Sequence, residues 1–388
     1  MSMLLTKRLA RSLWRTKLRL SAVVFMVAVG VFAGISFGSY ANAATTLYDE
    51  IYDGEEGVNL ADVWIENPTG VWNNSATESI CDSIVTQWPE TDYPIESCEA
   101  RLVIDGMMLT SESDGTEKVI PAVWHGIDEG LVDKVWMPTY SDLSSGRIAQ
   151  TSDEIVLDSH VAIDLGVNLG DEIDISAGYG KFSYEVVGIG FHPMHLYFAT
   201  EGSTLPADAG TFATGYMTDS GLEKLSNHTS GSSNLILLDV KGTPDYDLQS
   251  TSDIDENPKM TKLVSDLSEL MSDIDDAPVS VYDRSGVFSV EILRADAEGA
   301  ANMYPYVTGM IAAIAGITIF LSLQRLIQSQ AKEIAVLRTL GVPKKSIMPG
   351  YIIAPLVIGA VGSVIGTVLG IYLGAPGMLS FYESMIGL

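Results

Sequence analysis

The stretch YPYVTGMIAAIAGITIFLSL, residues 304–323, contains no charged side chain and lies within 26 uncharged residues that separate Glu298 from Arg325. About 20 apolar residues are enough for a helix to cross a bilayer. The sequence therefore predicts a transmembrane span over residues 303–324.

Two further uncharged runs have the same character. One holds 29 residues and ends before Asp49, and the other holds 37 residues and ends before Glu383. They predict spans over residues 20–42 and 349–374. Three spans would make the chain a membrane protein.

The first of these spans has an alternative interpretation as a secretory signal. A basic leader, an apolar stretch and Ala41-Asn42-Ala43 are typical of a cleaved signal peptide. The apolar core is longer than the ~7–15 residues usual in such signals, which favours an uncleaved anchor. In both cases the residues that follow lie outside the cytoplasm, and the later spans disfavour a secreted protein.

The distribution of charge orients the spans. The chain has 22 Lys and Arg against 50 Asp and Glu, a net charge of −28, but between Asp49 and Glu298 there are 48 acids and 11 bases, a net charge of −37. Such acidity excludes a nucleic-acid binder. The remaining basic residues gather in two short windows, and cytoplasmic flanks carry the Lys and Arg excess. The basic residues of these windows are Lys7, Arg8, Arg11, Arg15, Lys17, Arg19, Arg325, Lys332, Arg338, Lys344 and Lys345.

The expected organisation is a multi-pass protein of the cytoplasmic (plasma) membrane with its N-terminus inside and one large domain outside. The leader is predicted as an amphipathic helix, with leucines on one side and positive charges on the other, which suits the anionic inner leaflet. The predicted segments are a cytoplasmic helix 1–19, span 20–42, external domain 43–302, span 303–324, cytoplasmic loop 325–348, span 349–374 and a short external tail 375–388.

The external block is predicted as α+β, because β-rich runs alternate with single helices. A polar, acidic segment at residues 243–257 is expected to be a loop. The predicted strands cover residues 58–66, 97–109, 118–124, 153–157, 171–176, 182–189, 235–240 and 279–282, and the predicted helices 75–87, 159–165, 220–225 and 258–271.

The two cysteines, Cys81 and Cys98, both fall in the external block, 17 positions apart. An oxidising compartment permits a disulfide between them, worth about 3 kcal/mol at this loop size. Two separate buried thiols are the alternative.

Several segments, in order along the chain, resemble permeases of ABC transporters of the MacB and FtsX kind. RSLWRTKLRLSAVVFMVAVGVFAG at 11–34 is similar to the entry into their first span. DEIVLDSHVAIDLGVNLGDEIDIS at 153–176 followed by YEVVGIG at 184–190 resembles the MacB-type external core, and QAKEIAVLRTLGVPKKSI at 330–347 resembles their cytoplasmic loop. Residues 191–300 match loosely.

This resemblance implies a MacB-like core with a smaller subdomain outside, an elbow helix at the N-terminus and a coupling helix in the cytoplasmic loop. A separate ABC-type ATPase would dock there and use ATP and Mg²⁺, so that this chain binds no cofactor itself. A second permease copy, identical or different, and membrane lipids are the other implied partners. The motion would expel or extract a lipoprotein, a peptide or a small molecule by mechanotransmission.

The cytoplasmic loop also supports a helix on its residues alone. Apolar side chains recur at helical spacing between polar ones, Gly341 is suited to a left-handed cap, and Pro343 to the first turn of a following helix. A helix that merely packs on the protein's own spans is the alternative. The candidate contacts of the coupling helix are Lys332, Glu333, Ile334, Leu337, Arg338, Thr339 and Leu340.

Glycines recur at every fourth position in two of the spans, a pattern that permits close helix crossings. They are Gly30, Gly34, Gly38, Gly362, Gly366, Gly370 and Gly374. The spans hold no Asp, Glu, Lys, Arg or His, which disfavours a proton-coupled carrier or an ion channel.

Enzymatic motifs are absent from the sequence: there is no P-loop, no GxSxG and no HExxH. His192 and His195 could meet a metal in principle, but Pro193 between them favours a turn, so no metal site is expected. The predicted function is therefore a non-enzymatic permease subunit. The alternative is a membrane-anchored external sensor or binding protein without ATP coupling.

One departure from the family pattern concerns the end of the chain. Permeases of this kind carry a further span after the third, whereas only residues 375–388 follow here. The sequence is thus expected to be a fragment, a split half or a reduced subunit.

Overall fold

The computed structural model describes residues 17–48, 51–52, 60–88, 92–111, 117–127, 145–200, 207–242, 244, 257–274, 278–329, 331–339, 341 and 343–386. The chain divides into two compact units. One comprises Met1–Ala44 and Gly299–Tyr382, and the other Thr45–Glu298 and Glu383–Leu388. Residues 1–16 of the predicted amphipathic helix 1–19 and most of the predicted loop at 243–257 lie outside the described residues.

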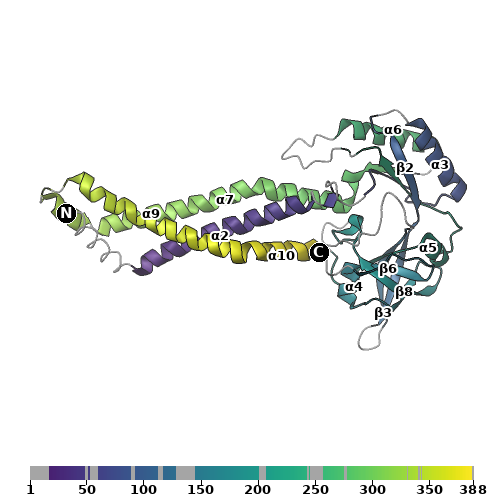
Figure 1. The fold of residues 1–388 in the computed structure, drawn as a ribbon, viewed down its shortest axis with the longest axis horizontal. Coiled ribbons are helices and arrows are strands. Elements are labelled where there is room, and N and C mark those ends of the chain that lie inside the picture. Colours follow the sequence, from purple (N-terminus) through teal and green to yellow (C-terminus); the bar gives the residue numbers. More distant parts are fainter. Residues whose placement is uncertain are drawn as a thin grey trace. The chain divides into compact units, whose positions relative to one another are not determined.

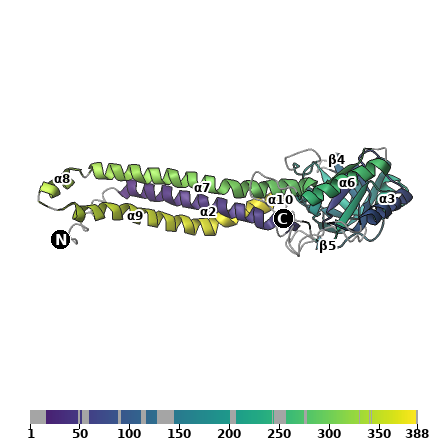
Figure 2. The same cartoon turned by 90° about the horizontal axis from the view of Figure 1, so that it is seen from above.

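The first unit is a set of long apolar helices. Within the described residues, three helical stretches are long and apolar enough to cross a membrane: Leu20–Tyr48, Phe288–Leu321 and Leu356–Tyr382. Each overlaps one of the three predicted spans. Figures 1 and 2 show α2, α7 and α9 side by side. The elements are α2 (Lys17–Tyr48), α7 (Phe288–Ser329), α8 (Ala331–Thr339), α9 (Lys344–Leu369), a π-helical turn η4 (Gly370–Gly374) and α10 (Ala375–Ile386).

Two of these helices are longer than the hydropathy pattern indicates. Helix α7 begins at Phe288, fifteen residues before the predicted span. Residues 288–302 include several charged side chains, so the sequence predicts that they belong to the external domain. In the structure they form the first turns of α7, the helix that continues into the second span. Residues 375–386, expected as a tail, continue the last span as α10.

The larger sheet of the second unit closes on itself. Its strands follow the order β5-β8-β6-β9-β4-β3-β7, and β7 also pairs with β8. The closed sheet surrounds Trp124, Tyr184 and Leu157, with α4 and α5 contributing Val161 and Leu222 to the same core. The elements are β3 (Val103–Ser111), β4 (Glu117–Gly126), β5 (Ser145–Gly146), β6 (Glu154–Asp158), α4 (Ser159–Leu165), β7 (Glu172–Ser176), β8 (Lys181–Gly190), β9 (Ala213–Met217) and α5 (Asp219–Ser226).

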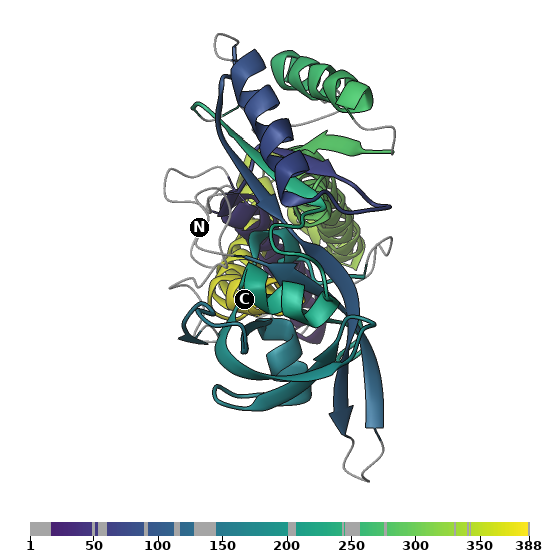
Figure 3. The same cartoon turned by 90° about the vertical axis from the view of Figure 1, so that its right-hand side faces the viewer.

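The smaller sheet is covered by two helices. Its order is β11-β1-β10-β2, and all its pairings are antiparallel. Ile84 of α3 and Leu267 of α6 pack on the same side as Ile65 and Leu238, and Figure 3 shows both helices there. The elements are β1 (Val63–Glu66), α3 (Asn74–Gln87), β2 (Ile95–Arg101), β10 (Leu235–Val240), α6 (Pro258–Ile274) and β11 (Ser280–Asp283).

The two sheets are joined where β2 passes into β3. The side chain of Asn234 accepts from Val103 N at 2.8 Å and donates to Val103 O at 2.8 Å. Its backbone N–H donates to Arg101 O. One polar residue thus satisfies the backbone at the point where the chain leaves one sheet for the other.

Most of the predicted external elements are confirmed. The predicted strand 235–240 and helix 159–165 have the observed bounds, and the other helices differ at their ends by three residues or fewer. The prediction of one strand over residues 97–109 is wrong, because the segment forms two strands, β2 and β3, which separate at Leu102 and belong to different sheets. Strand β9, with the sequence ATGYM, was not predicted, since its small residues carry little alternation.

Candidate functional site

Helix α8 connects the second and third spans and contains most of the predicted coupling residues. Among the described side chains, Lys332, Val336 and Arg338 are exposed. Thr339 is exposed as well, and its hydroxyl donates to Val336 O at 2.8 Å. The side chains of the other candidates, Glu333, Ile334 and Leu337, and the whole of Leu340 lie outside the described part of the structure. The apolar stripe of this helix therefore stays a prediction.

The end of α8 has the predicted geometry. Gly341 has a φ of 82°, in the left-handed region, and its N–H donates to Arg338 O at 3.1 Å. Pro343 occupies the N-cap of α9, one residue before the position that the sequence indicates. A sharp break thus separates α8 from the third span.

The glycines of the third span lie against α2. A Cβ added at Gly362 would lie 2.8 Å from Val27 Cβ, and one at Gly366 would lie 2.5 Å from Ala28 O. The next two glycines face α2 as well. A Cβ added at Gly370 would lie 2.9 Å from Ile35 Cβ, and one added at Gly374 would collide with Ser36 Oγ. Because distances under 3.0 Å are essentially never seen for real Cβ atoms, the absence of side chains sets how closely these two helices approach.

The glycines of α2 face α7 instead. A Cβ at Gly30 would lie 3.2 Å from Ile311, one at Gly38 would lie 2.8 Å from the ring of Tyr304, and one at Gly34 would have an ordinary contact of 3.8 Å with Thr308. Helix α2 therefore packs against α7 with its own glycines and receives those of α9 on another face.

The third span changes its winding between Gly370 and Gly374, where α9 passes through the π-helical turn η4 into α10. Both end glycines of this turn are buried. An inserted π-helical turn shifts every later side chain around the helix axis. The last two glycines that face α2, Gly370 and Gly374, are the first and last residues of this turn.

In the external unit, Arg284 ties together the segments that connect to the spans. Its guanidinium donates to Tyr52 O at 2.9 Å and to Leu60 O at 2.8 Å, and it pairs with Asp62 Oδ1 at 3.2 Å. Tyr52 follows α2 in the chain, and Arg284 precedes α7. The side chains of Arg284 and Asp62 are 8% and 3% exposed, so the pair is shielded from water.

Burial raises the pKa of Asp62 from 3.8 to about 7, although Arg284 and the N–H of Val240 lower it. The neighbouring Asp239 raises it further. A carboxyl whose pKa is raised on folding favours the folded state below pH 3.8, and this contribution is lost as the pH rises through 7. Arg284 is thus bonded to a carboxyl group, that of Asp62, whose pKa lies near neutral pH.

Residues 192–198, which we name the strap, lie beside the same connecting segments. Tyr52 donates its hydroxyl to Pro193 O at 2.9 Å, and the N–H of Tyr197 donates to Ser289 Oγ, in the first turn of α7, at 2.8 Å. Pro193–His195 forms a 3-10 turn, as predicted.

The strap places two histidines against a third. His195 Nε2 lies 3.2 Å from Nε2 of His125, at the end of β4, and the rings of His192 and Tyr216 stack with centroids 4.9 Å apart. His192 Nδ1 accepts from Met194 N, so that nitrogen carries no proton. A metal-bound histidine usually donates from its second nitrogen, so this arrangement does not suit a metal. Within the described residues no group of three or more His, Cys, Asp or Glu could hold a metal ion.

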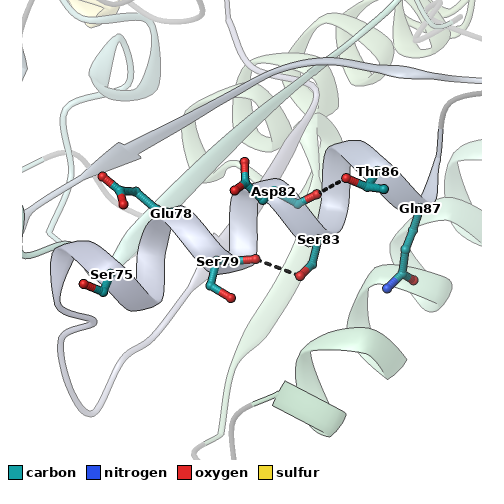
Figure 4. Close-up of a pocket in the computed structure, with 7 residues that line it drawn as sticks. All are labelled: Ser75, Glu78, Ser79, Asp82, Ser83, Thr86 and Gln87. Atoms are coloured by element: carbon teal, nitrogen blue, oxygen red, sulfur yellow. Dashed lines mark hydrogen bonds between the residues drawn. The ribbon is translucent and has the colours of Figure 1, made fainter.

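The cysteines and the outer face of α3 complete the external features. Cys81 on α3 and Cys98 on β2 form a disulfide with a Cα–Cα distance of 5.8 Å. Figure 4 shows a shallow pocket on the exposed face of α3, where Ser83 and Thr86 donate to Ser79 O and Asp82 O of the same helix. These two hydroxyls are thus bonded within the helix. Its lining is Ser75, Glu78, Ser79, Asp82, Ser83, Thr86 and Gln87.

Comparison with known proteins identifies the class of the membrane unit. Residues 306–388 match the family model described as FtsX-like permease C-terminal. The chain is thus a membrane protein with an external domain and an FtsX-like permease domain.

This match agrees, over residues 306–388, with the resemblance to FtsX-like permeases seen in the sequence. No curated protein matches the chain.

Two solved structures are similar to the chain. The periplasmic region of MacB from Actinobacillus actinomycetemcomitans is 13% identical, with a TM-score of 0.31, over 60% of this chain and 92% of that one. The extracellular domain of the noncanonic ABC-type transporter YknZ from Gram-positive bacteria is 12% identical, with a TM-score of 0.30, over 57% of this chain and 98% of that one.

Proposed function

We propose that this chain is the membrane subunit of an ABC transporter and that a separate ATPase docks on α8. The FtsX-like permease domain is the observation that carries the proposal, because it includes α8. The exposed side chains of Lys332, Val336 and Arg338 support it, since a short helix with free polar and apolar side chains is suited to a protein partner. ATP and Mg²⁺ would bind to that partner.

The proposed mechanism is mechanotransmission. Helix α7 extends from Phe288 to Ser329, immediately before α8, with Pro305 inside it, so a displacement of α8 would be passed along one helical rod. At the other end of this rod, Ser289 is bonded to the strap, and Arg284 is bonded to Tyr52 and Leu60. Motion of the external domain would then expel or extract a substrate, with a second permease copy completing the transporter.

The test is co-purification in mild detergent from the native membrane. We expect an ATP-binding protein with a P-loop motif, identified by mass spectrometry, whose ATPase activity co-elutes with the chain. Arg338→Glu and Leu337→Asp should each remove it. Lys262→Glu, on the exposed face of α6, should leave it bound and serves as the control.

The alternative is an anchored sensor or binding protein without ATP coupling. The proposal fails if no P-loop ATPase co-purifies, or if its yield is the same in the Arg338→Glu variant as in the unmodified chain.

A further inference from the structure

The strap is held by hydrogen bonds that require neutral histidines. An N–H···N bond of 3.2 Å between His125 and His195 needs one ring nitrogen without a proton, since two imidazolium rings would both donate. The bond from Met194 N to His192 Nδ1 has the same requirement. Two separate contacts in the strap therefore fail when these rings are protonated.

The surroundings of the histidines do not favour added positive charge. His125 is 6% exposed and His192 is 1% exposed. The ring of Tyr216, from β9, lies against both. Burial, together with His195, His192 and Arg101 of β2, holds the pKa of His125 well below 6.5.

On its opposite side, the strap is attached to the segments that lead to α2 and α7. Tyr52 and Ser289 bind it there through Pro193 O and Tyr197 N. The charged group near this side is Asp296, which together with burial raises the pKa of Tyr197. Besides its own histidines, the strap is thus faced, within the described residues, by His160, which stacks on Phe198 and pairs with Asp158. The other titratable and charged groups facing it are His125, Tyr216, Arg101, Tyr52 and Asp296.

We propose that the strap is a proton-sensitive latch: with neutral histidines it joins the outer face of β4 and β9 to the first turn of α7, and acidification releases it. Four of the five histidines of the chain, His125, His160, His192 and His195, lie in this layer, since His160 contacts the ring of Phe191 next to the strap. This inference does not rest on the proposed function. It predicts that external pH controls how firmly the external domain is bound to the helix that enters the membrane.

The test is hydrogen–deuterium exchange of the full chain in detergent micelles at pH 7.5 and 5.0, with labelling times corrected for the intrinsic rates. One histidine that is neutral in the closed strap and titrates normally in the open one raises the open population ~30-fold between these pH values. Peptides covering residues 192–198 should show a rise of this order. Peptides covering β10 should change little.

Two matched variants identify the source of the effect. His125→Gln keeps an acceptor for His195 but cannot titrate in this range, so it should lose most of the rise. His228→Gln changes the fifth histidine, after α5, and should retain it. If His125→Gln lowers the melting temperature at pH 7.5, His125→Phe, which keeps a ring against Tyr216, replaces it.

Three results would overturn the latch. They are equal corrected exchange of the strap at both pH values, a rise in the His125 variant as large as in the unmodified chain, and an equal rise in β10, which would indicate general unfolding.

Discussion

Arg284 shows how one residue can hold a junction that no sequence motif reveals. It stands in a short 3-10 turn between β11 and α7, and its donors bind three carbonyl groups, those of Tyr52, Leu60 and Ala61, and one carboxylate from the segment that follows α2. Hydrogen bonds to charged groups are about twice as strong as those between neutral ones. The junction is therefore fixed by these side-chain donors in addition to the pairing of β1 with β11, which ends where Arg284 N donates to Asp62 O at 3.1 Å.

We expect Arg284→Met to destabilise the external domain by about 3 kcal/mol, because removing one partner leaves Asp62 and three carbonyl groups without the donors of Arg284. The pKa of Asp62, already about 7, permits protonation and limits the loss. Thermal unfolding in detergent at pH 7.5 measures the change.

The matched control is Arg147→Met. Arg147 pairs with Glu154 through two hydrogen bonds, but its side chain is 47% exposed and its charge is screened by water, so the loss should be clearly smaller than that of Arg284→Met. Equal effects of the two substitutions would show that Arg284 has no special role.

At the scale of the element, the packing of the third span against α2 depends on the glycines of one helix face. A Cβ at Gly366 would lie 2.5 Å from a backbone oxygen, which no rotamer change can relieve. Gly359, on the same helix, has no atom within 4 Å of an added Cβ. Glycine is therefore required for close packing at position 366, whereas at position 359, two turns earlier, there is room for a larger residue.

Gly366→Ala should separate α9 from α2 and destabilise the membrane unit by about 1–3 kcal/mol, the range typical of overpacking. Gly359→Ala should change stability by less than about 0.5 kcal/mol. Thermal or denaturant-induced unfolding in one detergent, followed by far-UV circular dichroism, compares the two. If both variants unfold at the same temperature or denaturant concentration as the unmodified chain, the close packing of α9 on α2 would be ruled out.

At the scale of the whole molecule, charge is divided between the two environments. The segment from Asp49 to Glu298 has a net charge of −37, whereas the windows beside the spans are basic. Like charges within one domain repel each other and destabilise its compact state. The range of this repulsion is set by salt, with a Debye length of about 10 Å at 0.1 M.

We expect the melting temperature of the external domain to rise by a few degrees between 0.05 and 0.5 M NaCl, because screening weakens the repulsion. Differential scanning calorimetry of the full chain in a non-ionic detergent measures it. Sucrose at equal osmolality is the control and should not reproduce the full shift. A melting temperature that is unchanged or lower in salt would contradict the prediction.

The local elements were predicted well because their signals are local. The alternation of 235–240 and the stripe of Leu263 and Leu267 depend only on neighbouring side chains. The division of residues 97–109 at Leu102 depends on Asn234, far along the chain, and could not be predicted. The start of α7 at Phe288 was missed for a similar reason, since its charged first turns are supported by Ser289 and Arg284.

The sequence by itself determined the membrane class, the α+β character of the external block and the family resemblance. These properties follow from hydropathy, charge and short-range periodicity, which need no partner residue. Only the tertiary structure decided that His125 meets His192 and His195, that Arg284 binds Tyr52, and that the glycines of α9 face α2. These contacts join residues distant in the chain, and the physical cause is packing, which depends on the path of the backbone between them.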